Sequence, residues 1–497
     1  MIRVLNETKR LQKNFWSNCL FHPTDAVEDP WGRKILDRMA KDQSIKTIRI
    51  YTMFEDIVYL DENDNLAYDF RLNDLRLDYL CEKGYDILLA YGLMPDCIAT
   101  NKNATSNVSK NKTRYKGKLI NTSTPTDYKL WEEICYTYTK HIIERYGIET
   151  VSKWHLQCFN EPDIPPFFMS DLPKEQLATR IKEYCKLYTA FANGIQRASD
   201  KVRFGGPALS NKREFLGAFL DYVRENSVRL DFISLHNYAG MNIELLHNKV
   251  QKFSVSHWMR TQQEYLDVIA QHGFADTEVI VDEWGMAAWG FYNIEECPAF
   301  IARETEVHSS YYVKMICEIL KKEWKIEKLM ICLSGQHEMV TDFSGFRNFF
   351  TLNFFAKPIY NAHVLAAKLH ENLLSAETDN ENLFVIPTKS ANGDYSVLLT
   401  YSSEYFEEDI PEICEELVFE KGMEDKRVRV YCIDKQTTNP YRLYQRMGEP
   451  KLGEPEIKAL REEGNIKPIA EFVASGTDKI NLKLTPNSVY LVEVIEK

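Results

Sequence analysis

Eight short apolar runs recur along the first two thirds of the chain and alternate with longer amphipathic stretches. They read FWSNCLF (15–21), KTIRIY (46–51), YDILLAYG (85–92), WHLQCFN (154–160), VRFGGPA (202–208), DFISLHNY (231–238), EVIVDEW (278–284) and KLMICLS (328–334). Nearly continuous apolar runs of this length are typical of parallel strands that are buried on both faces. The stretches between them, such as 126–147 and 174–198, have the pattern of helices. The alternation therefore predicts eight strand–helix units.

Eight such units predict an α/β fold with a (β/α)8 barrel at residues 15–370. A doubly wound sheet would show the same alternation, but the glycine-rich dinucleotide motif that would favour it is not found in the sequence. After residue 370 apolar and polar positions alternate around the turn pair Asn392-Gly393, which predicts a hairpin. We predict an accessory β-sandwich at 371–497, with residues 1–14 as a candidate additional strand.

Composition limits the class of protein. The chain has 497 residues, of which 44% are hydrophobic, enough for one large core and a smaller second domain. The net charge of −12 argues against a dedicated nucleic-acid binder, and no apolar run approaches the ~20 residues of a membrane span. The 11 cysteines are scattered without a Cys-x-x-Cys pair, and the first residues lack the apolar core of a signal peptide. We expect a cytoplasmic protein with no nucleic-acid or membrane partner.

One polar segment, residues 101–126, interrupts the alternation. It carries six lysine or arginine residues and no acidic residue. Because it follows the third predicted strand, it would lie on the catalytic face of a barrel. A solvated surface loop and a lip that attracts an anionic substrate are both compatible with this composition.

Two glutamates stand at the carboxyl ends of predicted strands, where the reacting groups of a barrel enzyme converge. Glu161 follows the fourth strand in Asn160-Glu161-Pro162, and Glu283 closes the seventh in Asp282-Glu283-Trp284. A single acid at such a place more often caps a helix or joins an ion pair. A pair fits glycosidic cleavage, in which one carboxyl group protonates the leaving oxygen and the other attacks the anomeric carbon or activates water.

The two motifs also carry a family resemblance. WHLQCFNEPD resembles the strand-four signature of the clan of retaining barrel glycosidases, and VDEWG resembles its strand-seven segment. NFWSNCLF, YGLMPDCIAT, HIIERYGIETVSKW, FGGPALS, LDFISLHNYAG and LTPNSVYLVEV follow the order of glycoside hydrolase family 39, the family of β-xylosidases and α-L-iduronidases. The resemblance covers nearly the whole chain, including the terminal β region.

The resemblance implies roles for individual residues. Glu161 corresponds to the acid/base, Glu283 to the nucleophile and Asn160 to the residue that binds the sugar 2-hydroxyl. His236 and Tyr238 correspond to a His-x-Tyr pair on strand six, with the Tyr beside the nucleophile, although a core histidine is an equally good interpretation of His236. The remaining candidates for substrate binding, some of which also fit packing or loop positions, are Tyr51, Glu55, Phe168, Trp284, Trp289 and His337.

Two departures from the family pattern bear on the substrate. After the second strand, Tyr51 and Glu55 stand where the β-xylosidases tend to have histidines. After the eighth strand, Ser334 stands where the family has a tryptophan platform. Loss of that ring removes a large apolar contact from the sugar site.

We therefore expect a retaining exo-glycosidase that works by double displacement, β-xylosidase-like and acting on plant-derived oligosaccharides, with no cofactor or metal. One alternative is a glycosidase for uronic-acid or arabinose-containing glycans. Another is a non-catalytic sugar-binding barrel. A metal-dependent hydrolase using His236, Glu283 and His337 lacks the usual spacing of metal ligands. Assembly into a homo-oligomer is left open.

Overall fold

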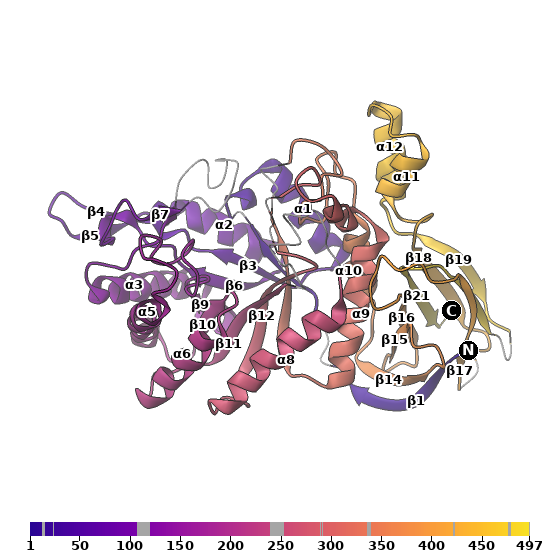
Figure 1. The fold of residues 1–497 in the computed structure, drawn as a ribbon, viewed down its shortest axis with the longest axis horizontal. Helices are drawn as coiled ribbons and strands as arrows, with labels where there is room; N and C mark the ends of the chain where they lie inside the picture. The colour runs from indigo at the N-terminus through magenta and orange to yellow at the C-terminus, as the bar shows by residue number, and fades with distance from the viewer. Residues whose placement is uncertain are drawn as a thin grey trace.

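The computed structural model describes residues 1–11, 15–22, 24–106, 120–238, 253–288, 290, 292–334, 339–420, 423–475 and 479–496, without the side chains of 6–8. A closed barrel of eight parallel strands forms one part of the protein, and a nine-stranded mixed sheet forms the other. In Figure 1 the sheet stands at the right of the barrel, and the helices α11 and α12 project above it.

The barrel strands are the eight predicted from the apolar runs. They are β2 (Asn18–Phe21), β3 (Thr47–Tyr51), β6 (Asp86–Tyr91), β9 (His155–Cys158), β10 (Arg203–Leu209), β11 (Phe232–Tyr238), β12 (Glu278–Gly285) and β13 (Ile326–Leu333). Pairing of β13 with β2 closes the barrel. The largest difference is at β2, where Phe15 and Trp16 are buried but precede the strand, so their apolar character reports burial rather than strand geometry.

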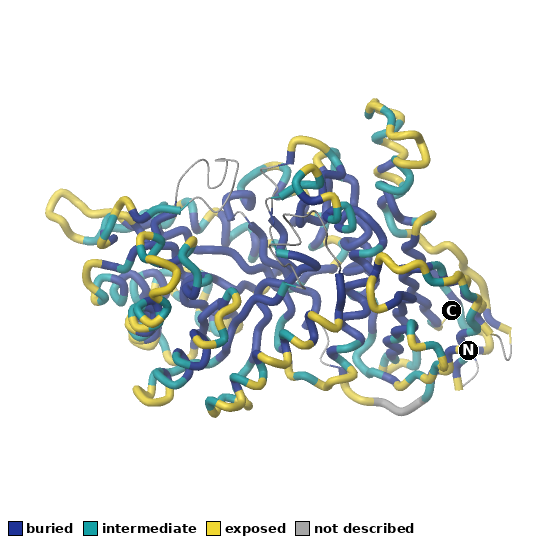
Figure 2. Tube along the Cα trace, in the orientation of Figure 1, coloured by how far each residue is buried: buried dark blue, intermediate teal, exposed yellow. Residues whose placement is uncertain are grey.

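Helices surround the barrel, and four of the described ones begin at a residue whose side chain caps the first turn. Asp29, Asp127, Ser254 and Thr305 each accept a hydrogen bond from the first turn of the helix that follows. The α-helices of this part are α1 (Pro30–Asp42), α2 (Arg71–Glu82), α3 (Tyr128–Tyr146), α4 (Ile148–Val151), α5 (Leu177–Ala198), α6 (Arg213–Glu225), α8 (Val255–Gln271), α9 (Glu306–Lys322) and α10 (Pro358–Ala366). Figure 2 shows the buried strands at the centre of this part.

Short elements sit in the loops between the strands and helices. The 3-10 helices are η1 (Thr24–Val27), η2 (Phe54–Asp56), η3 (Asp96–Ile98) and η5 (Pro298–Glu304), and the small hairpins pair β4 (Val58–Leu60) with β5 (Leu66–Tyr68) and β7 (Thr105–Ser106) with β8 (Ile120–Asn121). Residues 107–119 lie outside the described residues, so the interpretation of the basic segment 101–126 as a lip stays a prediction.

The nine-stranded sheet has the order β19-β18-β21-β16-β15-β14-β1-β17-β20. Its members are β1 (Ile2–Arg10), β14 (Asn372–Glu377), β15 (Leu383–Lys389), β16 (Tyr395–Tyr401), β17 (Ile413–Phe419), β18 (Arg427–Ile433), β19 (Pro468–Val473), β20 (Ile480–Leu484) and β21 (Ser488–Ile495); α11 (Pro440–Arg446) and α12 (Glu454–Glu463) lie between β18 and β19. Strands from both ends of this order, such as β18 and β20, contribute to one apolar core. The sheet therefore folds over itself as a sandwich does.

The predicted hairpin is β15–β16, which pair antiparallel around Gly393 at φ +96°. The first strand of the chain also belongs to this sheet, because β1 runs antiparallel to β14 and parallel to β17. The proposed domain boundary near residue 370 stays a prediction; β14 begins just beyond it.

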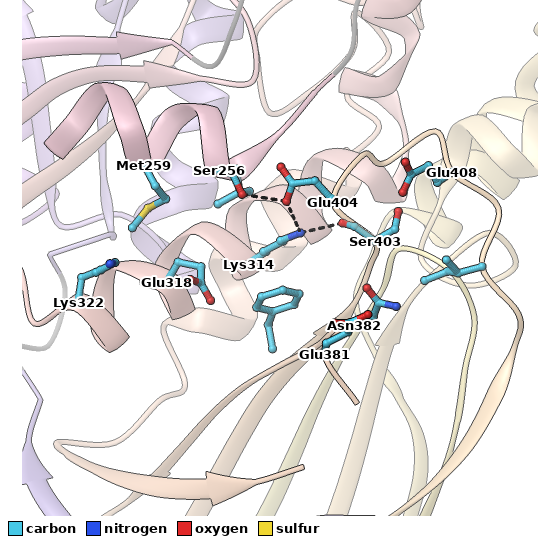
Figure 3. A pocket seen from close by; sticks show the side chains of 13 residues that line it. Ser256, Met259, Lys314, Glu318, Lys322, Glu381, Asn382, Ser403, Glu404 and Glu408 are labelled. Carbon is cyan, nitrogen blue, oxygen red and sulfur yellow. Dashed lines mark hydrogen bonds and ion pairs between the residues drawn. The ribbon is translucent and has the colours of Figure 1, made fainter. Parts of the chain in front are cut away.

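The seam between barrel and sheet contains a cavity of about 640 Å³ between α8, α9 and the loops at the ends of β15 and β16. Figure 3 shows the buried Lys314 at its wall. The Lys314 ammonium group donates to the Ser403 carbonyl at 2.7 Å and lies 3.8 Å from Glu404, whose carboxylate accepts from Ser256 at 2.8 Å. Burial lowers the pKa of Lys314. These contacts tie two barrel helices to the sheet.

Among the described helices, none has the length and apolar character needed to cross a bilayer.

Candidate active site

Glu161 and Glu283 both stand at the carboxyl end of the barrel. Glu161 follows β9, and its φ of +43° lies in the left-handed region, which is rare for residues other than glycine. Its N–H donates to the Ala208 carbonyl at the end of β10 at 3.0 Å. Strained backbone held by its neighbours is a recurrent feature of functional sites. Glu283 lies within β12 and is 8% exposed.

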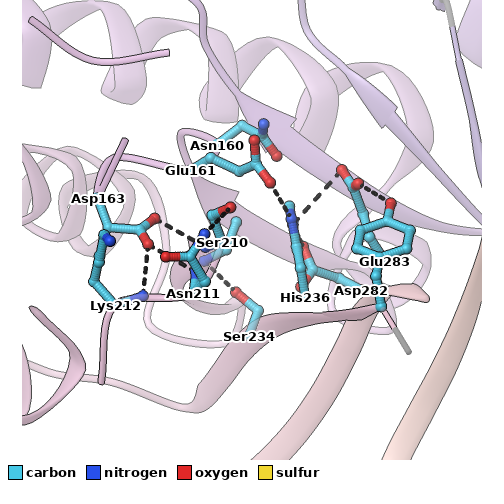
Figure 4. Close-up of polar contacts among 12 residues, drawn as sticks. Asn160, Glu161, Asp163, Ser210, Asn211, Lys212, Ser234, His236, Asp282 and Glu283 are labelled. Atoms are coloured by element: carbon cyan, nitrogen blue, oxygen red, sulfur yellow. Dashed lines mark hydrogen bonds and ion pairs between the residues drawn. The ribbon is translucent and has the colours of Figure 1, made fainter. Parts of the chain in front are cut away.

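His236, near the end of β11, lies between the two glutamates (Figure 4). Its Nδ1 is 2.7 Å from Oε1 of Glu161, and its Nε2 is 3.6 Å from Oε1 of Glu283. His236 is 1% exposed. Burial alone would lower its pKa, but the negative charges of Glu283 and Asp282 raise the pKa of His236 to about 10. The ring therefore lies between two carboxyl groups whose negative charges favour its protonated form.

Tyr238 and Arg49 hold the other side of Glu283. The Tyr238 hydroxyl donates to Oε2 at 2.5 Å, and the Arg49 guanidinium donates to Oε1 at 2.8 Å. Arg49 also donates to the amide oxygen of Asn160 at 2.7 Å. Because that oxygen is occupied, the NH2 group of Asn160 is the end turned away from Arg49.

The two glutamates have opposite electrostatic environments. Burial alone would raise the pKa of Glu283, but His236, Arg49 and the Tyr238 hydroxyl outweigh it and lower the pKa to about 2. Burial raises the pKa of Glu161, and the hydrogen bond from His236 offsets this only in part. Glu283 is thus ionised at neutral pH, while Glu161 is the group that retains a proton more readily. Such a division suits one nucleophile and one acid.

A second layer of polar groups lies under this pair. Gln157 on β9 accepts from Arg49 at 2.9 Å and donates to Ser234 at 2.8 Å and to Asp282 at 2.7 Å. The sequence interpretation missed Arg49, Gln157 and Asp282. The signal was present, because each is a charged or amide residue inside a buried strand, where such a group needs a buried partner.

Glu161, His236 and Glu283 offer ligand atoms within 4.8 Å of one another, close enough for a metal ion. Their environment does not suit one. Oε1 of Glu283 accepts from the Arg49 cation, Oε2 accepts from Tyr238, and Nδ1 of His236 is hydrogen-bonded to Glu161. The donors instead fit a negative nucleophile and a protonated acid.

Where the resembled family has a tryptophan, this chain has Ser334, and the guanidinium group of Arg347 packs against it. Ser334 is buried, and its hydroxyl accepts from Nε of Arg347 at 3.1 Å. The Arg347 guanidinium lies over the Tyr238 ring, 4.9 Å from its centroid. A Cβ on Gly290 would come within 2.6 Å of both Ser334 and Arg347 atoms, so the wall is tightly packed here. Arg347 was not predicted.

Four further predicted residues differ in what the structure says of them. Tyr51, at the end of β3, is buried and lies beside the site, with its ring 5.2 Å from the Arg49 guanidinium. Glu55 is half-buried in η2, four residues further along the chain. Trp289 and His337 lie outside the described residues, and their predicted roles stay predictions.

Comparison with known proteins identifies the family. The family model of glycosyl hydrolases family 39 matches residues 1–478. The chain belongs to this family. It is a glycoside hydrolase, so its substrate is a carbohydrate. A β-xylosidase from Caldicellulosiruptor saccharolyticus is 24% identical over 99% of this chain and 98% of its own length. An α-L-iduronidase from Canis lupus familiaris is 30% identical over 31% of this chain and 23% of its own.

Solved structures share the architecture of this family 39 enzyme. A monomeric β-xylosidase from Caulobacter crescentus superposes with a TM-score of 0.83 over 100% of this chain and 99% of its own, at 18% identity. A family 39 enzyme from Xanthomonas axonopodis pv. citri gives a TM-score of 0.79 at 16% identity, over 100% of this chain and 97% of its own. At these identities the likeness establishes the fold alone.

Two predicted sugar-binding aromatics of the glycosidase are instead core residues. Trp284 is fully buried and stacks on Tyr312 of α9, with ring centroids 5.7 Å apart. Consecutive strand residues point to opposite faces, so a Glu283 that faces the barrel interior turns Trp284 outward to the helices. Phe168 is also fully buried, 5.5 Å from the Phe159 ring. These contacts favour a packing role for both rings, because proximity in sequence to Glu161 or Glu283 does not fix the direction of a side chain; their contact with sugar stays a prediction.

Trp284→Ala should therefore cost stability rather than specificity. We expect a loss of about 3–5 kcal/mol in the free energy of unfolding, the usual range for truncating a buried aromatic residue. Urea denaturation followed by circular dichroism measures it. The ratio of kcat/KM values between different glycosides should stay as in the wild type. A stable variant with altered glycone preference would return Trp284 to the binding site.

Proposed function

We propose that this glycosidase is a retaining, exo-acting enzyme of the β-xylosidase type, with Glu283 as nucleophile and Glu161 as acid/base. The observation that carries the proposal is the spacing of the two carboxyl groups, whose oxygen atoms approach within 4.8 Å. Retaining glycosidases hold their carboxyl groups ~5–5.5 Å apart, whereas inverting enzymes need ~6.5–9.5 Å to admit a water molecule.

In the first half-reaction Glu283 attacks the anomeric carbon and Glu161 protonates the leaving oxygen. The hydrogen bonds from Tyr238 and Arg49 keep Glu283 ionised and fix its orientation before the attack. Arg49 donates to the Asn160 amide oxygen, and in this mechanism the Asn160 NH2 group donates to the sugar 2-hydroxyl, a contact that strengthens in the transition state.

In the second half-reaction Glu161 removes a proton from water, which hydrolyses the glycosyl-enzyme. The change of role follows from charge. The negative charge of Glu283 contributes to the raised pKa of Glu161, and this charge disappears when Glu283 becomes an ester. The pKa of Glu161 then falls, so the residue that began as an acid becomes a base.

A β-xyloside is our first choice of substrate, and we infer that it comes from plant-derived oligosaccharides. The support is the likeness over nearly the full length to proteins named β-xylosidase. The test is a panel of nitrophenyl glycosides carrying β-xylose, α-arabinose, β-galactose, β-glucose, β-glucuronic acid or α-iduronic acid. Cleavage of the xyloside with retained configuration, read by NMR of the first product, is expected. Binding of sugars without cleavage would favour a non-catalytic barrel.

Arg347 favours a second candidate, a uronic acid as the glycone. A guanidinium beside the nucleophile offers a paired donor for a carboxylate, and it stands where the resembled xylosidases have an apolar platform. Alignment of α-L-iduronidases over part of the chain is consistent with this candidate.

Arg347→Gln distinguishes the two candidates. For a uronide substrate we expect kcat/KM to fall by about 10- to 150-fold relative to the matching neutral glycoside, which is the loss of a charged hydrogen bond worth about 1.5–3 kcal/mol. The ratio between the two glycosides is the measurement, because Arg347 also helps to lower the pKa of Glu283. Arg347→Lys, which retains the charge, is the control. An unchanged ratio in Arg347→Gln contradicts the uronide candidate.

A further inference from the structure

Asp282 lies beneath the two glutamates and is fully buried. Its Oδ2 accepts from Gln157 at 2.7 Å and lies 3.2 Å from Arg49 and 3.5 Å from Nε2 of His236. Neither Oδ1 of Asp282 nor Nε2 of His236 has a hydrogen-bond partner within the described part of the chain. Two carboxylates face that side of the ring at nearly the same distance, Asp282 at 3.5 Å and Glu283 at 3.6 Å from Nε2.

The strand is built to place this acid in the interior. Adjacent residues of a regular strand point to opposite faces, so Asp282 and Glu283 would not both face the barrel. The pairing of β11 with β12 shifts at this point, from Leu235 opposite Val281 to His236 opposite Glu283. Asp282 is the extra residue. This irregularity has the character of a β-bulge, a device that re-aims a side chain next to active sites.

We propose that Asp282 is a positioning residue that acts through His236. As a fixed anion on the Nε2 side, it keeps both ring nitrogens protonated. The Nδ1–H group then always donates to Oε1 of Glu161. The proton that Glu161 transfers is therefore on Oε2, the oxygen that faces the leaving group. This inference rests on the proposed acid/base role of Glu161.

The charges around the ring support this assignment. His236 faces Glu161 from the loop after β9, and Asp282 and Glu283 from β12. Arg49 of β3 faces the same two acids of β12 from the other side. During turnover Glu283 loses its charge to the sugar ester, whereas Asp282 keeps its own. The charge of His236 therefore has a constant partner through both half-reactions, and the orientation of Glu161 does not depend on the state of the nucleophile.

The test is Asp282→Asn, which keeps the shape and removes the charge. In the wild type we expect the 15N NMR shifts of His236 to report two protonated nitrogens from pH 5 to 8, in accord with a pKa of about 10. In the variant we expect a proton to be lost within that range. Asp231→Asn, the same change at the residue before β11, where Asp231 accepts from the Phe204 N–H, is the matched control and should leave His236 unchanged.

Kinetics supply the second measurement. For alkyl glycosides, which need the acid, kcat/KM of Asp282→Asn should fall by about 10²-fold, the lower end of the contribution of general acid catalysis. For 2,4-dinitrophenyl glycosides, whose phenolate leaves without needing a proton, the fall in kcat/KM should be much smaller. An equal loss on both substrates, or a His236 that stays doubly protonated in the variant, overturns the proposal.

The two measurements also separate this inference from the proposed function. A wild-type His236 that is neutral at pH 7 overturns the inference without any variant, even where Asp282→Asn does not fold. If the wild type cleaves no glycoside, the proposed function fails, while the NMR titrations still decide whether Asp282 holds the proton on His236.

Discussion

Glu283→Gln should reduce kcat/KM by at least about 10⁴-fold, the scale on which covalent catalysis is lost when its nucleophile is removed. The amide keeps the size of the carboxylate and a group for Tyr238 and Arg49 to contact, so the fold should persist. It has no charge with which to attack the anomeric carbon. Initial rates on the best substrate of the glycoside panel give the measurement.

The control for this variant lies on the same strand. Glu278→Gln removes an acid at the other end of β12, where Glu278 contacts His155 at 2.8 Å and Arg203 at 2.9 Å. We expect its activity to stay near that of the wild type. Mass spectrometry of the enzyme treated with a 2-fluoro glycoside should find the sugar on the peptide that contains Glu283. A label on another acid, or substantial activity in Glu283→Gln, contradicts the assignment of the nucleophile.

The architecture could be predicted from the sequence because barrel strands are buried on both faces. A run such as EVIVDEW has no side that faces solvent, so its apolar residues predict a strand even though the run contains acids. The same logic located Glu161 and Glu283, since strand ends meet at one mouth of the barrel. The family model and the closed barrel confirm the fold class, while the roles of the two glutamates stay predictions that the variants above test.

The direction of individual side chains could not be predicted in the same way. Trp284 adjoins Glu283 but faces the helices, whereas Asp282, on its other side, faces the interior because the strand pairing shifts there. Arg347 reaches the site from a loop 13 residues beyond Ser334. A register shift and a long-range loop contact leave no periodic signature, so alternation along the chain carries no information about them.

The pH dependence follows from the two glutamates. The raised pKa of Glu161 keeps its proton toward neutral pH, and kcat/KM should fall as the pH rises through that pKa because the acid is lost. The pKa of about 2 for Glu283 means that protonation of the nucleophile sets a limit only in strong acid. A plot of kcat/KM against pH should therefore fall on the basic side within the range where the protein is stable. This fall should be missing from Glu161→Gln.

Glu161→Ala should divide substrates by leaving group. For alkyl glycosides or xylobiose we expect kcat/KM to fall by about 10²–10⁴-fold, the usual contribution of a general acid. For 2,4-dinitrophenyl glycosides the first half-reaction proceeds without a proton, so the glycosyl-enzyme forms. It then accumulates, because its hydrolysis needs a base. Added azide, a nucleophile that needs no base, should restore turnover and yield a glycosyl azide with the configuration of the substrate, because the anomeric carbon is inverted twice: Glu283 displaces the leaving group, and azide then displaces Glu283. Azide product of inverted configuration would instead place the reaction outside the double displacement, and an equal loss on every leaving group would mean that Glu161 supports the fold of the mouth rather than the proton transfer.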